Sequence, residues 1–118
     1  MLKASSIAAQ TALGANLSYS KIPVFEDVES LLEQGLCPTG TRRNLETAAP
    51  QTEFSGSISL SPQLLLADAQ ISGGLLMAVP EANLEALMTE LQENMVANCA
   101  VVGQVVRSLQ PAAIQVGY

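Results

Sequence analysis

Several residue types on which catalytic and metal sites depend are scarce or missing in this chain. The 118 residues include no histidine, no tryptophan, 3% aromatic residues and only two cysteines, Cys37 and Cys99. Without histidine, neither a Ser–His nor a Cys–His pair can form within the chain, and we expect no zinc cluster. Two widely separated cysteines do not make a disulfide framework. We therefore expect two small, partly buried thiols in a cytoplasmic protein.

Positive charge is also in short supply. Five basic residues face eleven acidic ones, which gives a formal net charge of −6. A nucleic-acid-binding face needs basic side chains for the phosphates, and an anionic membrane attracts polybasic segments. No apolar run approaches the roughly 20 residues that span a bilayer. We therefore expect neither nucleic acid nor membrane among the partners.

The remaining residues are sufficient for one aliphatic domain over residues 1–118. Apolar residues make up 48% of the chain, and a domain of this length hides roughly 65% of the unfolded chain's surface. With so few aromatic residues, the core must be built from Leu, Val, Ile, Ala and Met. We see no internal repeat and no linker that would divide the chain.

The spacing of apolar residues predicts a mixture of helices and strands. We expect helices over residues 1–13, 24–34, 41–48, 61–69 and 81–95, and strands over 15–20, 74–80, 99–106 and 113–118. The short connection between the last two strands suggests a hairpin. This order predicts an α+β domain, with a mixed or antiparallel sheet of about four strands covered by helices.

The stretch PTGTRRNLE contains the first candidate site. Arg42 and Arg43 fall in the first turn of the helix expected from Thr41, which we take as its N-cap. Positive charge is disfavoured at that end of a helix. A phosphate-like anion held by Thr41, the free N–H groups and a guanidinium would reverse the balance. The alternative is a solvated surface pair.

The stretch DAQISGGLLMAVP contains the second candidate site. Gly73 and Gly74 directly precede the apolar run that we expect to form a buried strand, and successive N–H groups there can make an anion nest. The lysine and spacing of a P-loop are absent. The alternative is a plain turn or bulge. A single carboxylate, Asp68, is weak evidence for a metal site.

These two stretches resemble the C-terminal domain of selenide, water dikinase, also called selenophosphate synthetase. In that family the motifs read close to G-G-T-x-x-N and D-P-Q-T-S-G-G-L-L, and this chain has GTRRNLE (Gly40–Glu46) and DAQISGGLL within Asp68–Pro80. Phe54–Gly56 (FSG), also expected there, lies between them. The resemblance extends along most of the chain and to the wider group of aminoimidazole ribonucleotide synthetase-like proteins.

The chain departs from the family pattern at three motif positions. Thr39 stands where the family prefers Gly, Ala69 where it prefers Pro, and Ile71 where it prefers Thr. Neither cysteine lies in the family's catalytic context, and no counterpart of its N-terminal domain is present. We therefore expect no catalytic residue and no metal ligand in this chain.

The resemblance also implies what the whole enzyme does. The family makes selenophosphate from selenide, ATP and water, needs magnesium, and is usually a homodimer of two-domain chains. Its N-terminal domain supplies the reactive Cys or selenocysteine, a Lys, and most aspartates that hold metal and nucleotide. Its C-terminal domain is an α/β sandwich that closes over the ATP and phosphate site.

We therefore expect this chain to be inert alone, to have no cofactor of its own, and to need the N-terminal domain as its partner. The residues expected to face the phosphates are Thr41, Arg42, Arg43, Asn44, Ser72, Gly73 and Gly74. Two alternatives stay open: a non-catalytic dimerisation or interaction module, and a small anion-binding domain using residues 41–44.

Overall fold

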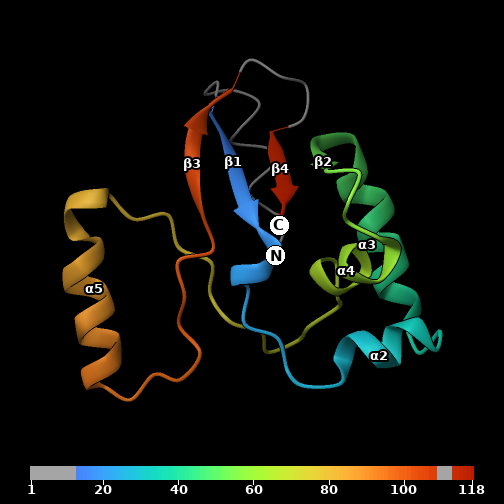
Figure 1. Ribbon diagram of the computed structural model, residues 1–118, viewed down its shortest axis with the longest axis horizontal. Helices are drawn as coiled ribbons and strands as arrows, with labels where there is room; N and C mark the ends of the chain where they lie inside the picture. Colours follow the sequence, from blue (N-terminus) through green and yellow to red (C-terminus); the bar gives the residue numbers. More distant parts are fainter. Residues whose placement is uncertain (1–12, 109–112) are drawn as a thin grey trace.

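The computed structural model describes residues 13–108 and 113–118 and confirms the expected α+β class (Figure 1). The helix expected over residues 1–13 lies outside the described residues, apart from Leu13, which begins a strand. The described elements are β1 (Leu13–Ser18), the 3-10 helix η1 (Tyr19–Lys21), α2 (Val28–Glu33), α3 (Thr39–Ala48), the 3-10 helix η2 (Ala49–Gln51), β2 (Thr52–Phe54), α4 (Leu60–Leu66), α5 (Glu81–Glu93), β3 (Gly103–Arg107) and β4 (Ile114–Gly117).

The described strands form one mixed sheet in the order β2-β4-β1-β3. β4 is parallel to both β1 and β2, whereas β3 is antiparallel to β1. The expected hairpin between β3 and β4 is therefore wrong, because β1 lies between them. Alternation of apolar residues identifies a strand but not its neighbour. β2 was missed because its three residues lie in a stretch rich in loop-forming residues.

The register of the sheet separates an apolar face from a polar one. Leu17 and Phe54 both lie beside Val116, on one face of the sheet. Asn16, Gln115 and their neighbours Gln104 and Glu53 form a row across the four strands on the other face, and all are exposed. Such sheets commonly pack one face and leave the other in water.

The core lies on the apolar face. Tyr19, Ile58 and Val116 are 3–6% exposed and form its centre. Partly buried residues that pack around them are Leu17, Phe54, Leu65, Leu66 and Ile114. Each fully buried aliphatic side chain of this size contributes roughly 1.5–3 kcal/mol. This cluster therefore holds α4 and η1 against the sheet.

Tyr19 also links the core to α2. Its hydroxyl donates a hydrogen bond to Glu29 of α2, and its ring meets that of Tyr118 edge to face, with the centroids 5.9 Å apart. Burial, and then the contact with Glu29, raise the pKa of the Tyr19 hydroxyl well above its usual range. α2 is shorter than predicted, because Asp27 before it has a left-handed backbone (φ 66°).

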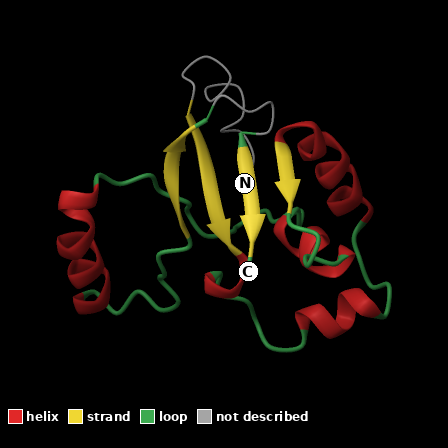
Figure 2. Cartoon of the chain, turned by 45° about the horizontal axis from the view of Figure 1, so that its top comes forward, coloured by secondary structure: helices red, strands yellow, loops and turns green. Residues whose placement is uncertain are grey.

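The rest of the chain, residues 69–102, leaves this body and is called the arm here. Figures 1 and 2 show α5 standing apart from the sheet and the other helices. α5 forms as predicted, but none of its residues is buried. The buried strand expected over 74–80 is wrong: this segment has neither helix nor strand, and Leu75 is 87% exposed. An apolar run indicates that a segment tends to be buried, but it does not show which other segment covers it.

Candidate functional site

The two candidate stretches meet at Thr41 and Asp68. Thr41 is fully buried, and its Oγ1 donates a hydrogen bond to Oδ1 of Asp68 at 2.9 Å. The same Oγ1 accepts a hydrogen bond from the backbone N–H of Ala69 at 3.3 Å. α3 is thereby joined to the first residues after α4, where the arm begins.

A second bond reinforces this junction one helical turn further along α3. Nδ2 of Asn44 donates to the carbonyl oxygen of Ala67 at 3.0 Å. Residues three apart share a face of a helix, so Thr41 and Asn44 point to the same segment. We call this set (Thr41, Asn44, Ala67, Asp68 and Ala69) the clamp.

Gly40 allows the clamp to close. A Cβ added at Gly40 would lie 3.3 Å from the Cβ of Ala69, which is tighter than ordinary van der Waals contact. Absence of a side chain therefore lets α3 approach the segment after α4. The spacing G-T-x-x-N is explained by packing and hydrogen bonding within the chain.

The clamp changes the interpretation of Thr41. α3 begins at Thr39 with Pro38 as N-cap, so the expectation that Thr41 caps the helix is wrong. The Thr41 hydroxyl has one proton to donate, and Asp68 accepts it. In this conformation, the Thr41 side chain has no exposed surface with which to meet a phosphate. Its place in a phosphate site stays a prediction.

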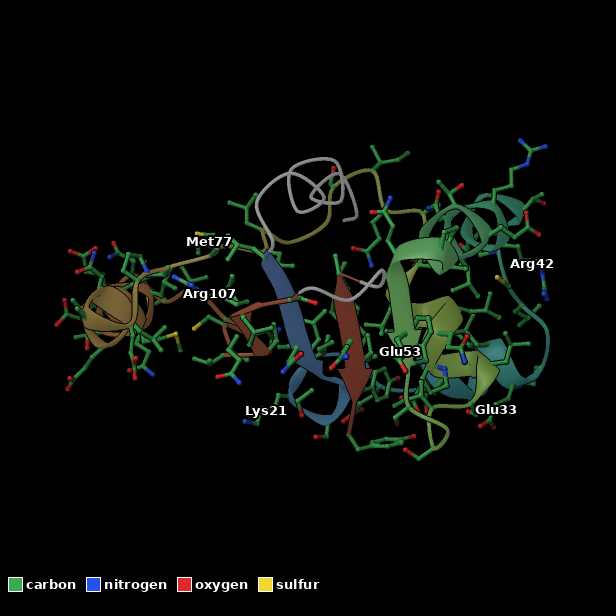
Figure 3. The ribbon with its side chains drawn as sticks, turned by 90° about the horizontal axis from the view of Figure 1, so that it is seen from above. Lys21, Glu33, Arg42, Glu53, Met77 and Arg107 are labelled. Carbon is green, nitrogen blue, oxygen red and sulfur yellow. The ribbon has the colours of Figure 1, made fainter. Side chains whose placement is uncertain are left out.

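Arg42 and Arg43 have the opposite surroundings. Both are exposed, and within residues 13–108 and 113–118 neither makes an ion pair. Figure 3 shows Arg42 at the edge of the molecule farthest from α5. A guanidinium presents a planar fork of donors that suits carboxylate or phosphate. The pair is therefore free to bind an anion or to remain solvated.

Ser72, Gly73 and Gly74 lie beyond the clamp, on the exposed arm. In the described part of the chain, no hydrogen bond joins them to α3. Neither glycine has a positive φ, so the alternating nest geometry expected for an anion is not formed here. A Cβ at Gly73 would lie 2.5 Å from Oε1 of Gln70, and the exposed Gln70 side chain would have to move to make room for it.

Asp68 is the residue whose role the sequence did not reveal. Its partner Thr41 is 27 positions away, and no local pattern signals a hydrogen bond over that distance. Among the residues with described positions, no three acidic or cysteine side chains gather as a metal site would require. Cys37 and Cys99 are half-buried free thiols, and Sγ of Cys37 donates a hydrogen bond to the carbonyl oxygen of Pro38 at 3.5 Å. None of the helices described is long and apolar enough to cross a bilayer.

Comparison with known proteins places the whole arrangement in one family. Residues 2–114 match the family described as AIR synthase related protein, C-terminal domain. Selenide, water dikinase of Carboxydothermus hydrogenoformans is 37% identical over 84 residues, which are 71% of this chain and 24% of that protein. The enzymes of the same name from Aliarcobacter butzleri and Clostridioides difficile are 29% and 28% identical over 84% and 90% of this chain.

The matched relatives are much longer than this chain. It spans 24% of the first of them and 29% of each of the other two. The resemblance expected from Gly40–Glu46 and Asp68–Pro80 is confirmed by these matches.

Proposed function

The chain belongs to the AIR synthase related protein C-terminal domain family, and we propose that it acts as the C-terminal domain of a selenide, water dikinase. The observation that carries this proposal is the clamp. Two segments that match the family motifs, 27 residues apart, are bonded to each other through Thr41 and Asp68. Both motifs are present in this chain and contact each other, which supports a fold and a role like those of the family.

The role that we propose is to close over the phosphates of ATP held elsewhere in the enzyme. Arg42 and Arg43 supply positive charge, and the backbone N–H groups of Ser72, Gly73 and Gly74 supply donors. The clamp secures residues 67–69, from which the chain continues to Ser72, to the face of α3 that carries Thr41 and Asn44. Phosphoryl transfer depends mainly on positioning and charge stabilisation, so a domain can contribute without a catalytic residue of its own.

Magnesium does not fit the described residues of this chain. Asp68 is bonded to Thr41, and no group of three potential ligands accompanies it in the part of the chain that is described. We propose that metal, nucleotide and the reactive residues belong to the remaining part of a family enzyme, which is the partner of this domain and which forms a homodimer. Two free thiols suit a reducing compartment, so we propose a cytoplasmic location.

The experiment is an assay of ATP-dependent selenophosphate formation by this chain alone, in which ³¹P NMR detects the product. We expect no turnover with selenide, ATP and magnesium present. A control with full-length Carboxydothermus enzyme shows that the assay detects product. Clear turnover by the isolated chain would show that the reactive groups lie within it, and the proposed division of labour would be wrong.

A second candidate function is anion binding by α3 alone. It is favoured by the exposure of Arg42 and Arg43, since neither guanidinium makes an ion pair with any residue whose position is described and both can offer their donors to a ligand. Calorimetric titration of inorganic phosphate and of ATP into the chain separates this candidate from the first. Binding of both with similar affinity favours a simple anion site.

A further inference from the structure

The chain as a whole exposes a large surface for its length. The chain exposes 8650 Å², whereas a compact monomer of this mass exposes about 6,100 Å². Its radius of gyration is 14.9 Å, against about 13.5 Å for a compact domain of this length. The excess, about 2,500 Å² per chain, is about three times the area that one partner buries in a standard specific interface.

Several large apolar side chains of the arm are exposed. Ile71 and Leu75 are almost fully exposed, and Met77 is half-exposed. On α5, the positions that form one apolar stripe are Leu84, Leu87, Met88 and Leu91, and all four are half-buried. Most of the stability of an amphipathic helix in a protein comes from packing of its apolar stripe. The arm therefore requires a surface to pack against.

The β1–β3 end of the sheet offers such a surface. β3 is an edge strand, and the register places Leu13, Val105 and Arg107 on one face of the β1–β3 pair. Leu13 is 41% exposed and Val105 is 55% exposed. In Figure 3, Arg107 lies on the side of the sheet where α5 stands. This face is apolar, open and edged by a cation.

Charge adds to the fit between the two surfaces. α5 contains four glutamates and no basic residue. Arg107 makes no ion pair in the described part of the chain. A glutamate beside the apolar stripe can therefore pair with Arg107 when the stripe lies on the β1–β3 face, although a partly exposed pair of this kind contributes little.

We propose that two copies of the chain exchange their arms, so that α5 of each copy covers the β1–β3 face of the other. The segments on either side of α5, residues 69–80 and 94–102, contain neither helix nor strand. They hold α5 away from its own sheet (Figure 1). Exchange of an identical element gives a closed two-fold dimer at little energetic expense, and the excess area is ample for such an interface.

Three variants test the exchange. Leu87→Glu places a charge in the apolar stripe, and Val105→Glu places one in the surface that receives it. Ala86→Glu is the matched control, because it adds the same charge on the opposite side of α5. Leu87 and Val105 lie outside the buried core cluster, so circular dichroism and urea unfolding are expected to show that every variant still folds.

Light scattering coupled to size exclusion measures the mass over a range of concentrations. We expect the unaltered chain and Ala86→Glu to form dimers. Leu87→Glu and Val105→Glu alone should dissociate at concentrations at least about tenfold higher, as loss of one buried aliphatic contact implies. Mixing these two variants should restore a dimer, since one copy then offers an intact arm and the other an intact surface.

A dimer that returns on mixing distinguishes exchange between chains from closure within one chain. If each arm closed on its own sheet, mixing the two variants would not repair the altered contact in either of them. A monomer with a radius of gyration near 13.5 Å by X-ray scattering would show that the arm closes on its own sheet. A monomer that keeps the open radius at high concentration would show that the surface awaits a different protein. A dimer that both glutamate variants leave intact would place the interface elsewhere. Each of these three results overturns the proposal.

Discussion

The body and the arm of this chain contain similar apolar residues in different surroundings. In the body, Leu64 and Val116 are 3% exposed. In the arm, Leu75 is 87% exposed and Met77 is 50% exposed. Apolar content therefore does not decide which segment becomes core. What decides it is whether the segment packs on the sheet. The clamp marks the position where the chain leaves the body, and the chain rejoins the sheet at β3.

The largest effect is expected from truncation of the body's core. Ile58 is 4% exposed and belongs to the buried cluster. Ile58→Ala should lower the free energy of unfolding by about 2–5 kcal/mol, measured by urea denaturation. Leu75→Ala, in the arm, is the control, and at concentrations low enough for the chain to be a monomer it should change this free energy by less than about 0.5 kcal/mol. Equal losses under these conditions would show that the arm is packed like the body.

Removal of the clamp's hydroxyl should have the next largest effect. Thr41→Val keeps the shape of the side chain but leaves Asp68 without its donor. An intramolecular hydrogen bond contributes about 0.5–1.5 kcal/mol, and water can reach the half-buried Asp68 in the variant, so urea unfolding should show a loss of about 1 kcal/mol. Limited proteolysis should cut residues 69–80 faster, because the root of the arm is loosened.

Thr47→Val is the matched control for the clamp. Thr47 is exposed and donates only to the carbonyl oxygen of Arg43 within α3. We expect a change of less than about 0.5 kcal/mol there. If both threonine variants behave alike, the Thr41–Asp68 bond does not secure the arm to α3.

The pH dependence of stability should report on Tyr19. Its pKa in the folded chain is raised above the value of about 10 that an unfolded tyrosine has. The folded state therefore retains the proton at a pH where the unfolded state has lost it. By linkage, stability from this group is fully present below about pH 10 and falls as the pH rises above it.

Urea unfolding between pH 8 and pH 11 measures this slope. Tyr19→Phe should make the decline shallower and should also remove the hydrogen bond to Glu29. An unchanged slope in the variant would show that other groups cause the decline and that the pKa of Tyr19 is not raised by folding.

The smallest effect on stability is expected from the exposed arginines of the body. The double variant Arg42→Ala, Arg43→Ala should unfold within about 0.5 kcal/mol of the unaltered chain. Any phosphate binding detected by calorimetry should weaken about tenfold or more, because hydrogen bonds to charged groups are stronger than average. Retained binding in the double variant would leave α3 without a role in anion recognition.

The sequence predicted local structure better than it predicted neighbours. The 3.6-residue spacing in 81–95 and the alternation in 113–118 led to α5 and β4 at nearly the observed bounds. The hairpin was wrong because the partners of β4 are β2 and β1, and β1 lies almost a hundred residues earlier in the chain. No local sequence pattern signals a pairing over that distance. The strand expected over 74–80 was wrong for the same reason, because its apolar residues indicated burial but did not identify the segment that would cover them.

For the candidate site, too, the sequence predicted which residues matter but not which residues they contact. Motif residues were identified from spacing and from the family resemblance, and the structure brings Thr41 and Asn44 together with the segment after α4. The sequence did not predict that their side chains bond to Asp68 and Ala67. That bonding depends on a close approach at Gly40, which only the folded arrangement reveals.

The central claim is that this chain is a working C-terminal domain of the selenide, water dikinase family. Its most direct test is to replace the matched segment of the Carboxydothermus enzyme with this chain and to measure selenophosphate formation. We predict turnover by the hybrid, and much less when the hybrid also contains Thr41→Val, since the clamp is then broken. A hybrid that folds and binds ATP but makes no selenophosphate would contradict the account.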